Sequence, residues 1–548
     1  MRKIRNTMQS VKRMCVVMAV ICCIVVLGSS VKTEAAGRPV TIASCLTVGT
    51  DVVCRIMAER IPASDDGMFY IYANEVYEDG PTGIVVAEVP AEKETSVSFP
   101  LNYNTADSNL SRKFLVAVKQ GGQMLQVSDE HYITNPEGNA EYTAFRMETG
   151  IKGILPDFSK ITDGGLEELG IQQVVYNMYI DDICSAEWVP GAIPFEYNGQ
   201  TWYFDKTTID SYDTMAAYFS GEGIQMTMVL LNGGRGMFSQ HMVHPMAVGG
   251  ECPGYALNTA DALGVNHLKA IGAFLAQRYS GYYECGQIDN WVLGNEINAR
   301  TSWWYMNSDS LDENVSAYVK AFRILYNEMK AVNANVRLYN SIDQEWNRKS
   351  NPGSFLAKDY LDRFNYYMNR EGNIDWGLSF HPYNSPLYDP YAWNGPAVWV
   401  KDDIKTPYIT MQNIDILIDY MHREELLNPY GDVRSISLAE IGYTSSFGTT
   451  AQEASVAYGY LKAASLPDVD AFMLFRHTDD AHEMKSKLAL GLCDLYGNKK
   501  PAYDIYKDLG TVNEAVAKER ASEIIGMDID EMIQNNIIWT RAGDGVVQ

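Results

Sequence analysis

The part of the sequence that follows Gly150 alternates between short apolar runs and helical patterns. Apolar runs bounded by polar or turn residues are typical of strands buried in a parallel sheet. The eight expected strands cover residues 151–155, 173–179, 225–231, 288–293, 337–340, 376–380, 435–439 and 471–475. The clearest helical patterns cover 260–279, 314–332, 415–425 and 451–464. Eight such alternations predict an α/β fold, a (β/α)8 TIM barrel with insertions over residues 150–510. A doubly wound sheet is the alternative, but no Gly-x-Gly-x-x-Gly turn follows the first strand.

Residues 38–145 have a different pattern, in which short alternating strands are separated by turns. The expected strands cover 52–56, 68–72, 83–86, 96–99 and 114–118. This recurrence predicts an N-terminal all-β, sandwich-like accessory domain. The segment has no evident aromatic platform, so a packing or spacer role is favoured over glycan binding. At the other end, residues 511–548 predict a helical tail that lies as a strap against the barrel.

Residues 1–36 predict a secretory signal peptide. Basic residues precede an apolar run over 14–27, and small residues then lead to a cleavage site near Ala35 or Ala36. We therefore expect a secreted, extracellular protein that has no membrane association after cleavage. The alternative is that the apolar run stays as a membrane anchor, although it is short for a span.

The net charge narrows the class of partner. The formal charge is −25 at pH 7, and loss of residues 1–36, with six basic and one acidic side chain, makes it −30. Such an acidic surface repels nucleic acid and polyanionic polysaccharide, so we expect no nucleic-acid partner and a neutral saccharide instead. The sequence does not indicate an oligomeric state.

Cysteine and histidine positions give no sign of a metal site. Six of the nine cysteines remain after signal cleavage, too dispersed for a disulfide framework and without metal-ligand spacing. Cys45 and Cys54 form the only local pair. His241 and His244 lie in a glycine-rich insertion over 232–258 with no carboxylate at ligand spacing, so we interpret them as ordinary loop residues.

Two of the expected strands end in a glutamate. Residues 291–296 read Trp-Val-Leu-Gly-Asn-Glu, so Asn295 and Glu296 follow the fourth strand, and Glu440 closes the seventh. In a TIM barrel the carboxyl ends of all strands meet at one rim, where active sites lie. Two carboxylates there predict acid/base or nucleophilic work on a sugar. Taken alone, Glu296 has a simpler interpretation as the cap of a following turn.

These residues resemble the retaining glycoside hydrolases of clan A, and most of all an uncharacterised bacterial group of clan-A-like barrels. The resemblance covers residues 150–510 and is strongest in the segment that ends at Glu296. It implies that Glu296 is the acid/base, that Asn295 contacts the sugar 2-hydroxyl and that Glu440 is the nucleophile. It implies no cofactor.

The same resemblance extends to His381 and Tyr383, which follow the sixth strand where clan members often have His-x-Tyr. A hydrogen bond from the Tyr383 hydroxyl would keep Glu440 ionised, and His381 would orient the neighbouring acid or contact substrate. The charge of Glu440 would in turn keep Glu296 protonated near neutral pH.

The sequence departs from the clan at the end of the eighth strand, where members often carry a tryptophan that forms the floor of the cleavage subsite. This chain has Phe475 there, and the arginine common on an early strand is not evident. We expect substrate contacts from loop aromatics and from polar residues after the eighth strand. These residues are Trp303, Trp304, Trp393, Arg476 and His477.

The sequence as a whole predicts a secreted hydrolase that cleaves a neutral β-linked oligo- or polysaccharide by a retaining mechanism with two glutamates. The alternative is a catalytically silent barrel that only binds glycans. Asp343 and Glu345 after the fifth strand, and Asp479 and Asp480 after the eighth, are expected to be solvated loop charges.

Overall fold

The computed structural model describes residues 38–236 and 239–542. The predicted signal peptide, residues 1–36, lies outside this part of the chain. In the described part, no helix is long and apolar enough to cross a membrane.

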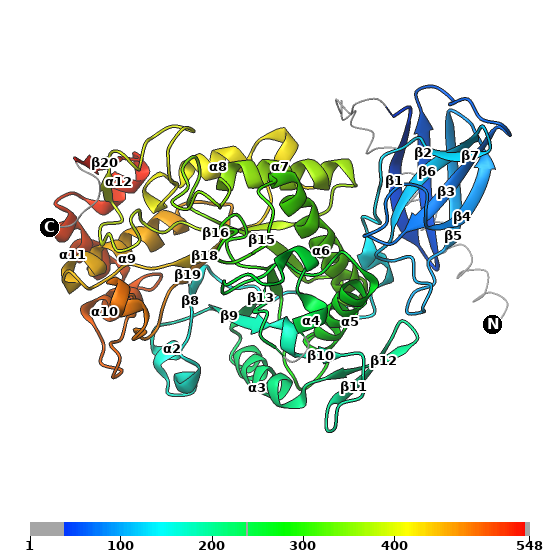
Figure 1. Ribbon diagram of the computed structural model, residues 1–548. Helices are drawn as coiled ribbons and strands as arrows, with labels where there is room; N and C mark the ends of the chain where they lie inside the picture. Colours follow the sequence, from blue (N-terminus) through cyan, green and yellow to red (C-terminus); the bar gives the residue numbers. More distant parts are fainter. Residues whose placement is uncertain (1–37, 237–238, 543–548) are drawn as a thin grey trace, which may run out of the picture. The chain divides into compact units, whose positions relative to one another are not determined.

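Eight parallel strands close into a barrel in which spatial neighbours follow the chain order (Figure 1). The strands are β8 (Lys152–Ile154), β9 (Gln173–Tyr179), β13 (Gln225–Leu231), β14 (Asn290–Leu293), β15 (Arg337–Asp343), β16 (Gly377–His381), β18 (Ile436–Ile441) and β19 (Val469–Leu474). Pairing of β19 with β8 closes the ring. Each strand lies where the apolar runs predicted it, so the (β/α)8 fold class is confirmed.

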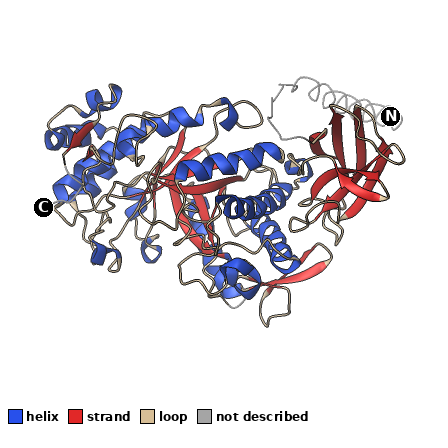
Figure 2. Cartoon of the chain, turned by 45° about the horizontal axis from the view of Figure 1, so that its top comes forward, coloured by secondary structure: helices blue, strands red, loops and turns tan. Residues whose placement is uncertain are grey.

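Helices connect most of the strands and lie outside them (Figure 2). The longer ones are α3 (Lys206–Gly221), α5 (Ala262–Arg278), α6 (Leu311–Val332), α7 (Ala357–Arg370), α8 (Asp415–Met421), α9 (Thr449–Ala464) and α10 (Pro501–Asp508). Three of them begin at a side-chain cap, because Asp205, Asp261 and Ser310 each accept a backbone N–H from the first turn. Such caps satisfy N–H groups that have no partner within the helix.

The barrel interior is filled by side chains rather than open. Its buried residues are Leu155, Val175, Val229, Leu231, Val292, Tyr339, Ala471 and Met473. Tyr176 and Phe475 pack on this cluster and are only partly buried. Alternate residues of the strands face outward and pack against the helices, which explains why the strands read as continuous apolar runs.

The N-terminal part contains two antiparallel sheets, as the alternating pattern predicted. One has the order β1-β2-β5, formed by Val40–Val48, Asp51–Ala58 and Glu94–Pro100. The other has the order β4-β3-β6-β7, formed by Ile84–Pro90, Met68–Asn74, Lys113–Gln120 and Gln123–Gln126. Cys45 and Cys54 face each other across β1 and β2, with 3.3 Å between their Sγ atoms, and both are buried free thiols.

A hairpin and the C-terminal tail complete the architecture. Strands β11 (Ile193–Tyr197) and β12 (Gln200–Phe204) are joined by Asn198 and Gly199, both with positive φ. Two positive φ values are the requirement of a type I′ hairpin turn. The tail forms α11 (Glu514–Ile525), α12 (Ile529–Gln534) and β20 (Trp539–Arg541), and β20 pairs with β17 (Asn394–Pro396) in the loop after β16.

Candidate active site

Glu296 sits on a turn that β15 holds in place. Its backbone is in the left-handed region with φ 41°, and its N–H donates to the Ser341 hydroxyl at 3.0 Å. Asn298 and Asp343 exchange two hydrogen bonds, of 2.7 Å from the Asn298 amide and 3.1 Å from the Asp343 N–H. A left-handed conformation is uncommon for a glutamate, and these contacts from the neighbouring strand stabilise it.

Glu440 and Glu296 meet around His381. Glu440 lies near the end of β18, and the Tyr383 hydroxyl donates to its Oε1 at 2.9 Å. The His381 Nδ1 atom lies 3.1 Å from Glu296 Oε1 and 3.8 Å from Glu440 Oε2. Because both distances start from the same nitrogen, Glu296 Oε1 and Glu440 Oε2 lie at most about 7 Å apart. The geometry thus brings together the four residues that sequence reasoning placed at the ends of strands four, six and seven.

Burial dominates the protonation of this group. Burial and, to a smaller extent, the charge of Glu345 together raise the pKa of Glu296 to about 7, against a lowering effect of a hydrogen bond from Trp303. Burial also raises the pKa of Glu440, against the lowering effects of His381 and of the Tyr383 hydroxyl. Burial lowers the pKa of His381, so its imidazole is neutral near pH 7.

Two of these effects differ from the sequence-based expectation. The charge of Glu345 contributes to the raised pKa of Glu296, and the pKa of Glu440 is raised, in part by the charge of Glu296, rather than held low. The reason is that both glutamates are withdrawn from water, which penalises the charged form of each.

Asp343 and Glu345 were expected to be solvated loop charges, and this expectation is wrong. Both are buried beside Glu296 rather than solvated. Burial and the charges of Glu296 and Glu345 raise the pKa of Asp343 well above its ordinary value. The expected strand ended at residue 340, whereas β15 continues to Asp343. A longer strand would have placed Asp343 and Glu345 at the same rim as Glu296.

Three of the other predicted site residues lie close to Glu296 or at the same rim of the barrel. Trp303 reaches Glu296 through its hydrogen bond, Asn295 is partly exposed next to it, and Arg476 lies at the same rim in a 2.9 Å ion pair with Glu483. Phe475 directly follows β19 and packs on the cluster inside the barrel. A phenylalanine therefore stands where clan members often carry a tryptophan.

Three predicted substrate contacts are not supported by the geometry. Trp304 is buried and packs edge-to-face on Tyr318, with ring centroids 5.0 Å apart. Trp393 is likewise buried, against Tyr391. The His477 ring is buried and its Nε2 lies towards Gly165, in the loop after the first strand. These loop residues pack into the core because apolar rings gain more from burial than from exposure.

No group of three or more His, Cys, Asp or Glu residues in the described part of the chain could hold a metal ion. His241 stacks on His267 with ring centroids 5.1 Å apart. The chemical groups that the site brings together are the carboxylates of Glu296 and Glu440, with His381 and Tyr383 as their partners.

Residues 144–532 match a family model described as a family of unknown function, DUF5722. No curated protein matches the sequence. Among solved structures, the chain is similar to a family 39 glycoside hydrolase from the gut symbiont Bacteroides cellulosilyticus WH2, with 14% identity and a TM-score of 0.43 over 84% of this chain and 79% of that one. A glucosidase from Croceicoccus marinus is 12% identical, with a TM-score of 0.40 over 68% of this chain and 69% of that one.

A third similar structure is a β-glucuronidase from Bacteroides uniformis, 9% identical, with a TM-score of 0.38 over 86% of this chain and 51% of that one. The chain thus spans about half the length of that enzyme. None of these similarities identifies the reaction or the substrate of this chain.

Proposed function

This chain belongs to the DUF5722 family, whose function is unknown, and we propose that it is a retaining glycoside hydrolase with Glu440 as nucleophile and Glu296 as acid/base. The observation that carries the proposal is the convergence of both carboxylates on the His381 imidazole at the carboxyl rim of a closed barrel. Such a pair within about 7 Å suits direct attack better than the wider gap that admits a water.

A double displacement needs Glu296 in its protonated form and Glu440 in its ionised form. Glu296, with a pKa of about 7, is largely protonated in mildly acidic solution and gives its proton to the oxygen of the leaving group. The Glu440 carboxylate attacks the anomeric carbon as the glycosidic bond breaks, and a glycosyl ester forms. Glu296, now ionised, takes a proton from water, whose oxygen attacks the anomeric carbon and releases Glu440.

Two residues keep the pair in these roles. The Tyr383 hydroxyl favours the ionised form of Glu440 through its hydrogen bond, and His381 Nδ1 lies 3.8 Å from Glu440 Oε2. His381 also contacts Glu296, so it fixes one carboxyl group relative to the other. The proposal needs no cofactor.

The charges around the pair favour a neutral β-linked glycan as the substrate. Glu345 and Asp343 lie beside Glu296, and the nearby cation Arg476 already pairs with Glu483. A uronic acid would therefore meet negative charge and a guanidinium whose charge is compensated. A neutral sugar meets no such penalty.

The test is hydrolysis of p-nitrophenyl β-glycosides of neutral sugars and of glucuronic acid by the wild type and by Glu440→Gln. We expect turnover of at least one neutral glycoside, retention of the β configuration in the first product seen by NMR, and loss of turnover in the variant. Binding of glycans without turnover would instead support the silent-barrel alternative. Inversion, or full turnover by Glu440→Gln, would overturn the assignment.

We also propose that the protein is exported, with residues 1–36 as its signal peptide, because of the basic start and the apolar run that follows. N-terminal sequencing of protein recovered from the culture medium should begin near residue 36. Retention of the full-length chain in the membrane fraction would favour the anchor alternative.

A further inference from the structure

A pocket of about 600 Å³ opens at the carboxyl ends of β19, β8 and β9. These strands follow β18, which carries Glu440, around the barrel. The volume is within the range of small-molecule sites. Its lining residues are Leu155, Pro156, Asp157, Phe158, Tyr176, Asn177, Tyr179, Tyr212, Arg476, Thr478, Asp479 and Asp480.

The pocket is rich in aromatic side chains that remain accessible. Phe158 is 41% exposed and Tyr179 is 45% exposed. Tyr176 packs beside Phe158, with ring centroids 6.3 Å apart, and the Tyr212 hydroxyl donates to the Asn177 carbonyl at 3.1 Å. Partly exposed rings that line the same pocket offer flat apolar surface on which a sugar can stack.

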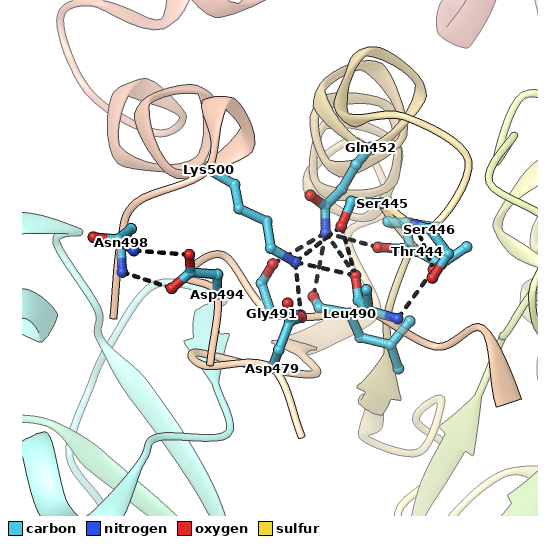
Figure 3. Close-up of polar contacts among 12 residues, drawn as sticks. Thr444, Ser445, Ser446, Gln452, Asp479, Leu490, Gly491, Asp494, Asn498 and Lys500 are labelled. Carbon is cyan, nitrogen blue, oxygen red and sulfur yellow. Dashed lines mark hydrogen bonds and ion pairs between the residues drawn. The ribbon is translucent and has the colours of Figure 1, made fainter. Parts of the chain in front are cut away.

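The charged groups of the pocket are already paired. Arg476 contacts Glu483 at 2.9 Å, and Asp157 lies 3.4 Å from the Lys160 ammonium. Asp479 forms a 2.7 Å ion pair with Lys500 (Figure 3). The cation among the lining residues, Arg476, already has Glu483 as its partner, so its charge is compensated. The carboxylate oxygens and the Asn177 side chain offer acceptors and donors that suit sugar hydroxyl groups.

One wall of the pocket is fixed before any ligand arrives. In Figure 3, Lys500 lies between Asp479 and Ser445, and donates to Ser445 Oγ at 2.9 Å. The Gln452 amide donates to the carbonyl oxygens of Tyr443 at 2.9 Å and Gly491 at 3.1 Å. These bonds tie the loop after β19 to the loop after β18 and to α9. A wall held in this way presents its polar groups without an ordering cost on binding.

The pocket is also connected to the catalytic pair. Phe475, whose ring lies on the barrel interior with Tyr176, directly precedes Arg476 at the pocket wall. Glu483, the partner of Arg476, acts electrostatically on Glu440. The pocket and Glu440 therefore lie at the same rim of the barrel, linked through Arg476 and Glu483.

We propose that this pocket is a second sugar-binding subsite, which holds a further unit of a neutral glycan by stacking on Phe158 and Tyr179. The inference rests on the proposed function and extends it, because it makes an oligosaccharide rather than a single glycoside the preferred substrate. The paired state of Arg476 makes the sugar in this subsite neutral.

The test compares chain lengths in the wild type, in the double variant Phe158→Ala/Tyr179→Ala and in Phe145→Ala. Phe145 is a matched control, since its ring is 90% exposed and lines a pocket at the amino ends of the strands. The probes are p-nitrophenyl β-glycosides with one to four units of glucose, xylose or mannose. We measure the ratio of kcat/KM for the longest probe to that for the one-unit probe.

We expect this ratio to rise with chain length in the wild type and to fall at least about tenfold in the double variant, as expected for the loss of two stacking rings. Phe145→Ala should keep the wild-type ratio. An unchanged ratio in the double variant overturns the subsite while the hydrolase assignment stands.

A wild type that hydrolyses none of the probes means that the proposed function fails, and calorimetric titration with the same oligosaccharides then decides the pocket separately. Binding that is lost in the double variant and kept in Phe145→Ala supports the subsite. Binding that is equal in all three proteins, or absent, overturns it.

Discussion

Two glutamates of this chain, the partly exposed Glu296 and the buried Glu328, have nearly the same perturbed acidity in very different surroundings. Burial raises the pKa of each to about 7. Glu328 lies within α6, is 1% exposed, and accepts hydrogen bonds from the hydroxyl groups of Tyr197 and Ser111. Glu296 lies at a strand end, on a left-handed residue, in contact with an imidazole that also faces Glu440.

The difference shows what a raised pKa does and does not indicate. Burial alone produces it, so a perturbed carboxyl group is only a candidate for a catalytic role. Glu328 joins α6 to the turn before β6 and to the β11–β12 hairpin through the neutral hydroxyl groups of Ser111 and Tyr197. Glu296 has in addition a second carboxylate nearby, a partly exposed side chain at the rim and a left-handed backbone held by its neighbours, which together favour catalysis.

The largest contrast should appear in turnover. We expect Glu296→Gln to lower kcat on a glycoside with a poor leaving group by about 10² to 10⁴-fold, because the general acid is lost. Azide should restore turnover of an activated aryl glycoside, which needs no protonation. Glu328→Gln should leave both reactions near the wild-type rate. Similar losses of turnover in Glu296→Gln and Glu328→Gln would show that the two glutamates do not differ in their catalytic role.

The second contrast concerns stability. Because the pKa of Glu328 is raised from 4.5 to about 7, its contribution to stability is fully present below pH 4.5 and is lost as the pH rises through 7. Glu328→Gln, which cannot ionise, should therefore gain free energy of unfolding relative to the wild type at pH 8, by up to about 3 kcal/mol. Denaturant unfolding at pH 5 and pH 8 measures this gain. A larger gain at pH 5 than at pH 8 would reverse the sign and contradict the protonated state of Glu328.

The smallest effect should be a shift in the pH profile. Removal of the Glu345 charge makes Glu296 easier to ionise, so Glu345→Gln should move the basic limb of kcat/KM to lower pH. Glu371→Gln is the matched control, since burial raises the pKa of that carboxyl to about 7 as well, but it lies at the end of α7. If the basic limb of the profile stays in place in Glu345→Gln, or moves equally in Glu371→Gln, the charge of Glu345 does not set the pKa of Glu296.

The sequence was sufficient for the barrel and for the central four residues of the site. Parallel strands buried on both faces are continuous apolar runs, and the residues after them must meet at one rim, which located Glu296, His381, Tyr383 and Glu440. Asp343 could not be placed in this way. Its position beside Glu296 depends on the register between β14 and β15, which pairs Val292 with Tyr339. A single sequence does not contain that register.

Loop residues were the least predictable part. Trp303 and Trp304 are neighbours in the chain, yet one contacts Glu296 and the other is buried against Tyr318. The direction of a loop side chain depends on the tertiary packing of several segments, which periodicity does not encode. The aromatic residues of the second subsite likewise come from three separate segments, after β8, in β9 and in α3.

The central claim is that Glu440 forms a covalent bond with the sugar. A 2-deoxy-2-fluoro glycosyl fluoride of the sugar found in the hydrolysis panel should trap this intermediate, because the fluorine slows its breakdown more than its formation. Mass spectrometry of the intact protein, followed by peptide mapping, then locates the label. We predict one added fluorosugar per chain, attached to Glu440, and no added fluorosugar in Glu440→Gln. A label on Glu296 or another residue, or continued hydrolysis without any label, would contradict it.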